Sequence, residues 1–199
     1  LTMALGAGSV TPWQMASAYA AFANGGYRIQ PYLVSEMQDS NGNVLARMTP
    51  VVAGEQAERV LDPRNVFLMD LMMKDVVRRG TAAKALSLGR NDLAGKTGTT
   101  NEYVDAWFCG YQPSLVGVSW VGFDQPKKLG SGETGGALAL PVWIDYMKVA
   151  LKGAPEQFLS VPTGLLKVKP SFEAEGDDLI YEEHLPADTG VETSDSSKP

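Results

Sequence analysis

Residues 95–100, of sequence GKTGTT, gather one cation, three hydroxyl groups and two glycines within six positions. An ammonium group supplies charge for an anion, and threonine hydroxyls supply directed hydrogen bonds to its oxygens. Glycine lets a ligand or another backbone come close to the chain. This composition suits two kinds of site: a phosphate-binding loop, and a substrate-binding strand beside a nucleophile.

The spacing of the glycines argues against the phosphate-binding loop. Its motif places a glycine at position 90, but that residue is Arg90, and the nearest glycine, Gly89, comes one position too early. The motif also needs a helix to begin at the lysine, so that backbone amides point at the phosphate. Residues 98–100, Gly-Thr-Thr, favour extended backbone instead.

A strand with this sequence suits acyl-transfer chemistry. The cation can lie beside a nucleophile, the hydroxyls can hold a substrate carboxylate, and the strand edge can pair with an extended peptide. The alternative is a threonine-rich surface strand with a solvated lysine. The Lys-Thr-Gly tripeptide alone does not decide between them, so the decision rests on the surrounding sequence.

The composition disfavours several other classes of function. The 199 residues are 44% hydrophobic and 20% charged, as expected for one globular domain. One Cys and one His leave a zinc site or a histidine-dependent triad without enough ligands or a placed base. The net charge of −6 disfavours nucleic acid, which clustered Lys and Arg bind. No metal or other cofactor is expected.

Four segments carry helical signals. Thr11-Pro12 followed by Gln14 has the pattern of a capping box, and Asp62-Pro63 repeats the start signal. Glycines follow the apolar stretches where these helices end. The predicted helices cover residues 12–24, 63–79, 81–88 and 140–152.

Strand signals predict an antiparallel sheet. Its three consecutive strands are residues 93–101, 106–111 and 115–124. Residues 32–48 are predicted to form a peripheral hairpin around an Asn-Gly turn. Three tryptophans in apolar elements are expected in the core: Trp107, Trp120 and Trp143. The fold class is therefore α+β, an antiparallel β-sheet flanked by helices.

Several motifs accompany residues 95–100 in a fixed order. They read DAWF at residues 105–108, GY at 110–111, WVG at 120–122, TGG at 134–136 and PVW at 141–143. Two more lie upstream, within residues 4–12 and 18–26. Together they strongly resemble the transpeptidase domain of class A penicillin-binding proteins, in particular the 1A type of Gram-negative bacteria. The resemblance covers about residues 1–152 and implies the C-terminal portion of a penicillin-binding protein/serine β-lactamase-like fold.

The resemblance also implies roles for the residues that match. Lys96 would organise the proton network around the nucleophile, and the hydroxyls of Thr97 and Thr99 would bind the carboxylate of a terminal D-alanine or of penicillin. The amide of Thr99 would form half of the oxyanion hole. Gly98 would let the substrate approach the strand. The other substrate-binding residues implied are Thr100, Asn101 and Tyr103.

Two of the three catalytic motifs of this family are absent from the sequence. No Ser has a Lys three positions later, and no Ser-x-Asn occurs. The chain opens Leu-Thr-Met, with no targeting signal. We therefore expect the C-terminal part of a longer polypeptide whose nucleophile lies upstream, and we expect this fragment alone to be inactive.

The resemblance implies that the parent protein cross-links peptidoglycan by serine acyl transfer. Its partners would be peptidoglycan stem peptides and β-lactams, together with the missing N-terminal part of the same polypeptide. The parent would be anchored in the bacterial inner membrane, at its periplasmic face. Two alternatives stay open: a D,D-carboxypeptidase or β-lactamase-like hydrolase, and a non-catalytic module that binds or scaffolds the cell wall.

Charge distribution suggests the domain boundary. Nine of the 23 carboxylates lie after residue 169, where the only cation is Lys198. Residues 1–160 are therefore expected to form the C-terminal portion of the transpeptidase domain, and residues 161–199 an acidic, disordered tail.

Overall fold

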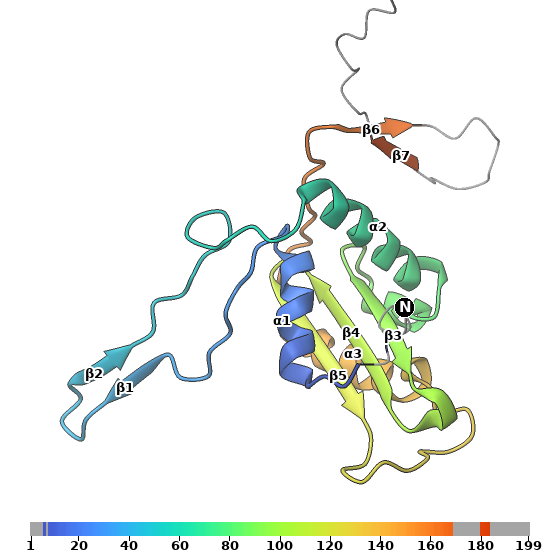
Figure 1. The fold of residues 1–199 in the computed structure, drawn as a ribbon, viewed down its shortest axis with the longest axis horizontal. Helices are drawn as coiled ribbons and strands as arrows, with labels where there is room; N and C mark the ends of the chain where they lie inside the picture. Colours follow the sequence, from blue (N-terminus) through green and yellow to red (C-terminus); the bar gives the residue numbers. More distant parts are fainter. Residues whose placement is uncertain (1–5, 7, 169–179, 184–199) are drawn as a thin grey trace, which may run out of the picture.

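A three-stranded antiparallel sheet forms the centre of the molecule (Figure 1). The computed structural model describes residue 6, residues 8–168 and residues 180–183. In spatial order the sheet contains β3 (Ala94–Thr99), β4 (Ala106–Gln112) and β5 (Leu115–Val121). The predicted antiparallel sheet is confirmed, and β3 is one of its edge strands.

The helix α1 (Pro12–Ala23) crosses one face of this sheet (Figure 1). Its predicted capping box is present, because Thr11 Oγ1 accepts from the Gln14 amide and the Gln14 side chain accepts from the Thr11 amide. Both amides would otherwise lack a partner in the first helical turn. Local sequence therefore determines where α1 begins.

The helix α2 (Pro63–Arg79) packs beside β3 and contains a buried ion pair. Lys74 Nζ lies 2.7 Å from Asp70 Oδ2, and the two side chains are 6% and 1% exposed. From β4, Tyr111 Oη donates to Asp70 Oδ1 at 3.0 Å. This network joins α2 to the sheet, where a small buried cluster contains Ala23, Met73, Ala94 and Tyr111.

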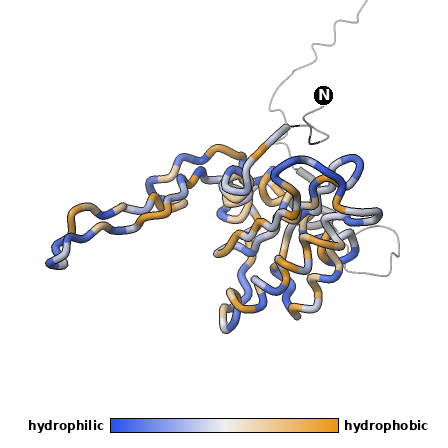
Figure 2. Tube along the Cα trace, turned by 90° about the horizontal axis from the view of Figure 1, so that it is seen from below, coloured by the Kyte–Doolittle hydropathy of each residue, from blue (hydrophilic) through white to orange (hydrophobic). Residues whose placement is uncertain are grey.

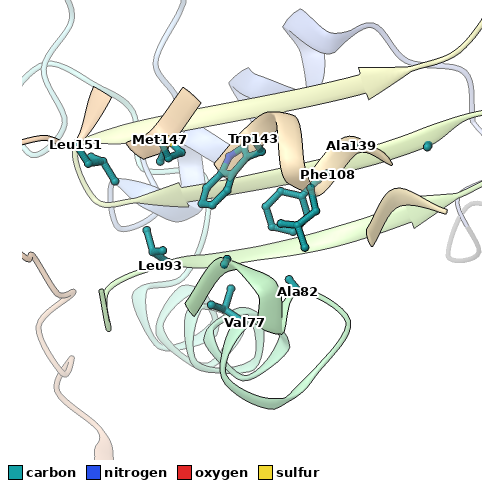
Figure 3. Close-up of a cluster of buried hydrophobic side chains, with 11 residues drawn as sticks. Val77, Ala82, Leu93, Phe108, Ala139, Trp143, Met147 and Leu151 are labelled. Carbon is teal, nitrogen blue, oxygen red and sulfur yellow. The ribbon is translucent and has the colours of Figure 1, made fainter. Parts of the chain in front are cut away.

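The other face of the sheet packs against α3 (Leu140–Ala150), which follows a single π-helical turn, η4 (Gly135–Ala139). Trp143 fills this interface, and its Nε1 donates to the Gly117 carbonyl at 3.1 Å. A Cβ at Gly110 or Gly117 would lie within 2.8 Å of the Trp143 ring, so only glycine leaves room for it. Figure 3 shows this main core, which also includes Val77, Ala82 and Phe108.

The other two tryptophans do not join this core. Trp107 and Trp120 pack against each other with ring centroids 6.0 Å apart, and Trp120 is 39% exposed. Alternation along β4 directs Trp107 away from Phe108 and therefore away from α3. The prediction that Trp120 is a core residue is wrong for this reason.

The chain between α1 and α2 forms an arm that leaves the body (Figure 1). Its strands β1 (Glu36–Gln38) and β2 (Val44–Arg47) pair antiparallel, which confirms the predicted peripheral hairpin. A bridge between Tyr27 and Arg59 closes its base. Apolar residues lie along the arm (Figure 2), and the exposed ones include Leu33, Val34, Met37, Val44 and Leu45.

A second ion pair fixes the chain that follows α3. Arg90 follows the 3-10 segment η2 (Ala83–Leu88) and binds Asp92, whose side chain is fully buried. Arg90 also donates to the Ala154 carbonyl at 2.8 Å, and the Gln157 amide donates to Asp92 at 3.0 Å. The chain therefore belongs to the body as far as Gln157.

Beyond residue 160, β6 (Leu165–Val168) and β7 (Ile180–Glu183) pair antiparallel. This ladder differs from the irregular tail that composition predicts, because both segments contain the β-branched and apolar residues that favour strands. The remainder of the predicted tail lies outside the described residues. Within the described part of the chain, no helix has the length and apolar character needed to cross a membrane.

Candidate active site

The edge strand β3 carries the segment that was predicted to do chemistry. Its register pairs Lys96 with Cys109 and Thr97 with Phe108 on β4. Cross-strand partners project to the same face, so Lys96 projects toward the face of α1, whereas Thr97 and Thr99 project toward the face of α3. These functional groups can therefore meet only at the outer edge of β3.

The ammonium group of Lys96 lies at that edge. Its Nζ donates to the Thr97 carbonyl at 2.9 Å and lies 3.4 Å from Thr97 Oγ1. Among the residues that the structure describes, no carboxylate forms an ion pair with Lys96. Its charge is therefore available to an incoming anion.

Thr97 has a second polar neighbour, from another element. Thr81 Oγ1 lies 2.8 Å from Thr97 Oγ1, directly after the end of α2 at Gly80. The backbone here is well fixed, because the amide of the fully buried Ala82 donates to the Val76 carbonyl at 3.0 Å. Two hydroxyls and one ammonium group thus lie together.

The hydroxyl of Thr99 is held from the α3 side. It accepts from the Gly135 amide at 3.0 Å, which leaves its own proton free. Gly135 approaches β3 so closely that a Cβ would lie 2.4 Å from the Gly98 carbonyl oxygen. The start of η4 therefore supports β3 and occupies one acceptor position of Thr99.

A strained turn joins β3 to β4. Glu102 and Tyr103 have φ values of 64° and 57°, in the left-handed region that residues other than glycine seldom adopt. Thr100 Oγ1 accepts from the Asp105 amide at 2.7 Å, and the Leu129 amide donates to the Tyr103 carbonyl at 2.8 Å. These bonds hold the turn in its strained conformation.

A pocket of about 460 Å³ opens beside this turn. An ion pair between Glu102 and Lys128 links its two walls. The residues that line the pocket are Thr100, Asn101, Glu102, Tyr103, Lys128, Gly130 and Ser131. Three of the predicted substrate-binding residues therefore lie in a pocket past the end of β3, and neither Lys96 nor Thr97 lines it.

Sequence reasoning missed the two groups that bind the strand hydroxyls. Gly135 belongs to the TGG motif at residues 134–136, so the sequence did mark this segment as part of the family pattern. Nothing in the sequence indicated that the Gly135 amide would contact Thr99. Thr81 lies 16 positions before Thr97. It had no signal, because only the packing of α2 against β3 brings the two hydroxyls together.

Nothing in this strand pair supplies a reactive thiol. Cys109, opposite Lys96, is 2% exposed, and burial raises its pKa to about 12. It is therefore protonated and a poor nucleophile at neutral pH. In the described part of the chain, no three His, Cys, Asp or Glu residues lie close enough together to hold a metal ion.

Residues 1–147 match the sequence profile of the family described as "Penicillin binding protein transpeptidase domain". The chain belongs to this family. The matched region contains the whole sheet, the residue trio of Lys96, Thr97 and Thr81, and most of α3. The resemblance that the motifs indicated is therefore confirmed.

Several relatives are named penicillin-binding protein 1A. The chain is 47% identical over 191 residues to that of Neisseria lactamica, covering 96% of this chain and 23% of the relative. It is 38% identical over 213 residues to that of Pseudomonas aeruginosa, covering 84% and 26%. The chain thus spans about a quarter of the length of these relatives.

Solved structures share the fold. Penicillin-binding protein 1A from Haemophilus influenzae matches with a TM-score of 0.85 and 32% identity, over 96% of this chain and 34% of that one. The D,D-transpeptidase domain of a peptidoglycan glycosyltransferase from Eggerthella lenta matches with a TM-score of 0.56 and 27% identity, over 72% and 33%. The predicted fold class is confirmed.

Proposed function

We propose that this chain supplies the carboxylate-binding strand of a peptidoglycan D,D-transpeptidase whose nucleophilic serine lies elsewhere in the same polypeptide. The observation that carries the proposal is the group of polar atoms at the edge of β3. There the Lys96 ammonium, with no carboxylate partner in the described residues, lies beside the Thr97 hydroxyl, which in turn contacts the hydroxyl of Thr81. Membership of the transpeptidase family supports the reaction class.

The substrate would bind along the outer edge of β3 as an extended peptide. Gly98 presents no side chain there, so a peptide backbone or a β-lactam can come close. The hydroxyls of Thr97 and Thr99 donate to the carboxylate of the terminal D-alanine, and Lys96 supplies positive charge. Asn101 and Tyr103 receive the part of the substrate that extends past the strand.

The proposed reaction proceeds in two acyl transfers. The serine oxygen attacks the carbonyl carbon of the bond between two D-alanines, the C–N bond breaks, and the serine proton passes to the leaving amine. The acyl group stays on the serine as an ester. An amine of a neighbouring stem peptide then attacks this ester, the ester C–O bond breaks, and a proton from that amine returns to the serine. The Thr99 amide and Lys96 stabilise the developing negative charge.

The proposal places the nucleophile outside this chain. No Ser-x-x-Lys occurs in the sequence, and the relatives are about four times as long as the matched region. We place the parent protein at the periplasmic face of the inner membrane, where stem peptides and β-lactams reach it. Its N-terminal part supplies the serine and the membrane anchor.

The isolated chain is therefore expected to form no covalent adduct with a labelled penicillin. Intact-mass spectrometry after incubation measures this directly, and the full-length parent protein serves as the positive control. An adduct of one penicillin per chain, at any serine of residues 1–199, would show that the nucleophile lies in this chain.

The decisive test is Lys96→Ala in the full-length parent. Loss of a preorganised charge costs about 3 to 4 kcal/mol, so the acylation rate constant should fall about a hundred- to a thousandfold. Thr97→Val should cost less, because Thr99 keeps a second hydroxyl. Lys148→Ala, an exposed lysine on α3, is the matched control. A folded Lys96→Ala variant with the parent's acylation rate would refute the assignment.

A further inference from the structure

The contact between Thr81 and Thr97 leaves one hydroxyl proton unused. Each threonine hydroxyl has one proton to donate and two lone pairs to accept with. The two oxygens lie 2.8 Å apart, so one proton is shared between them and the other is free. Which hydroxyl keeps its proton decides which one can bind an anion.

The neighbours of Thr97 at the site decide the direction of this bond. The ammonium group of Lys96 has only protons to offer, and Nζ lies 3.4 Å from Thr97 Oγ1, so Thr97 can only accept from it. A carboxylate is a stronger acceptor than a neutral hydroxyl, so a bound carboxylate takes the proton of Thr97. With that proton directed away from both neighbours, Thr81 becomes the donor of the bond between the two threonines.

The second hydroxyl of the strand has the same arrangement. Thr99 Oγ1 accepts from the Gly135 amide, which can only donate. With Thr81 as the donor to Thr97, each of the two strand hydroxyls accepts a hydrogen bond from outside β3 and keeps its own proton. Two outward protons on one strand suit the two oxygens of one carboxylate.

Thr81 is also held firmly enough to act in this way. Its backbone lies between the buried Ala82 and η4, where a Cβ on Gly136 would lie 3.1 Å from the Thr81 carbonyl oxygen. Its side chain is exposed at the surface of the site. Thr81 therefore joins the end of α2, β3 and η4 at one corner of the site.

We propose that Thr81 is a positioning residue for carboxylate recognition: it donates its hydroxyl proton to Thr97 and so directs the Thr97 proton at the substrate carboxylate. This inference rests on the proposed function of β3. It assigns to Thr81 no contact with the reacting atoms and no step of acyl transfer.

The test compares Thr81→Val with Thr81→Ser in the full-length parent. Valine keeps the shape of threonine and removes the hydroxyl, whereas serine keeps the hydroxyl. Acylation is measured with benzylpenicillin and with its uncharged methyl ester. Thr81→Val should lower the second-order rate constant for benzylpenicillin about three- to tenfold, the value of one oriented hydrogen bond, and leave the ester rate unchanged. Thr81→Ser should react as the parent does.

Thr49→Val, the same change on the exposed arm, is the matched control, and melting temperatures show that each variant is folded. Thr81→Ala replaces Thr81→Val if valine abolishes the melting transition. An equal loss for benzylpenicillin and the ester, no loss for either, or a Thr81→Ser variant as slow as Thr81→Val would overturn the inference.

The two proposals fail in distinguishable ways. If Lys96→Ala and Thr97→Val lower the benzylpenicillin rate and Thr81→Val does not, only the role of Thr81 is wrong. If all three leave that rate unchanged, β3 is not the carboxylate-binding strand and the proposed function itself is wrong.

Discussion

Three side chains with raised pKa values lie at the interface of the sheet with α1 and α2: Cys109 and Tyr111, which are buried, and Tyr19, which is half-buried. Burial raises the pKa of Cys109 to about 12 and that of Tyr19 to about 12. The pKa of Tyr111 is also raised, by burial and by the negative charge of Asp70 beside it. The folded protein therefore holds all three groups in their neutral, protonated forms.

This burial predicts a loss of stability in alkali. Unfolded Cys begins to lose its proton near pH 9 and unfolded Tyr near pH 10, whereas the folded protein keeps these protons. The folded state then binds more protons than the unfolded state, so the free energy of unfolding falls as pH rises from about 9 to 12. Each group contributes up to about 1.4 kcal/mol per pH unit.

Urea unfolding at pH 7, 9, 10 and 11 measures this fall. Cys109→Ala removes the first group to titrate. The free energy of unfolding of this variant should therefore decline less between pH 9 and 10 than that of the unsubstituted 199-residue chain. Identical slopes for the two proteins in that interval would contradict the role of the buried thiol.

For individual residues of the candidate site, the sequence could indicate which side chains to consider but could not predict their contacts. The GKTGTT segment predicted Lys96, Thr97 and Thr99 as site residues, and the structure places all three on β3. Strand alternation separates Lys96 from the two hydroxyls, and only the path of the lysine side chain brings its ammonium group back to Thr97. Thr81 depends on long-range packing, which a local pattern does not record.

At the scale of the elements, η4 contacts the candidate site through Gly135. A Cβ on Gly135 would lie 2.3 Å from the Trp107 carbonyl oxygen and 2.4 Å from that of Gly98. Both obstacles are backbone atoms, so they cannot move aside as a flexible side chain would. Any larger residue must therefore displace η4 from β3 and remove the amide that Thr99 accepts from.

Gly135→Ala should accordingly reduce both stability and acylation in the full-length parent. Overpacking of this kind costs about 1 to 3 kcal/mol of unfolding free energy, and the loss of the Thr99 contact should slow acylation about tenfold. Gly132→Ala is the matched control. Its φ of 80° predicts a strain of about 1 to 2 kcal/mol, but no atom lies within 4 Å of the added methyl, so acylation should be retained. Equal acylation rates for the two variants would contradict the role of η4.

The elements themselves followed largely from local signals. The capping box at Thr11, the Asp62-Pro63 start and the alternation in β3, β4 and β5 act over a few residues, so these elements were predictable. The π-helical turn of η4 was not, because no local pattern in residues 135–139 indicated it. The exposed Trp120 was misassigned because an apolar pattern does not say which face of a sheet is covered.

At the scale of the whole molecule, the arm and the body are distinct. The arm strands β1 and β2 pair only with each other in the described structure, and β2 is exposed along its full length. The two ends of the arm meet at the body, where the Arg28 amide donates to the Glu58 carbonyl at 2.9 Å. The core of the body therefore does not depend on the arm.

Replacing residues 30–56 by an Asn-Gly turn should leave the body folded. We expect the free energy of unfolding to change by less than about 1 kcal/mol, which shifts the melting temperature of a chain this size by under about 4 °C. Circular dichroism melting of the two chains tests this, with Trp143→Ala as the control for a genuine loss of core packing. A shift as large as that of Trp143→Ala would mean that the arm contributes to the core.

Among the strands that the structure describes, β3 pairs on one side only, and this has a consequence beyond the proposed catalysis. An edge strand without a partner is a template on which a strand of another molecule can add, and proteins commonly prevent this with a charged side chain, lysine above all. Lys96 places such a charge at this edge, and two copies that met edge to edge would bring their ammonium groups together. The charge that we propose attracts a carboxylate would therefore also oppose self-association, so we expect the solubility of the unliganded protein to depend on the same residue as its proposed chemistry.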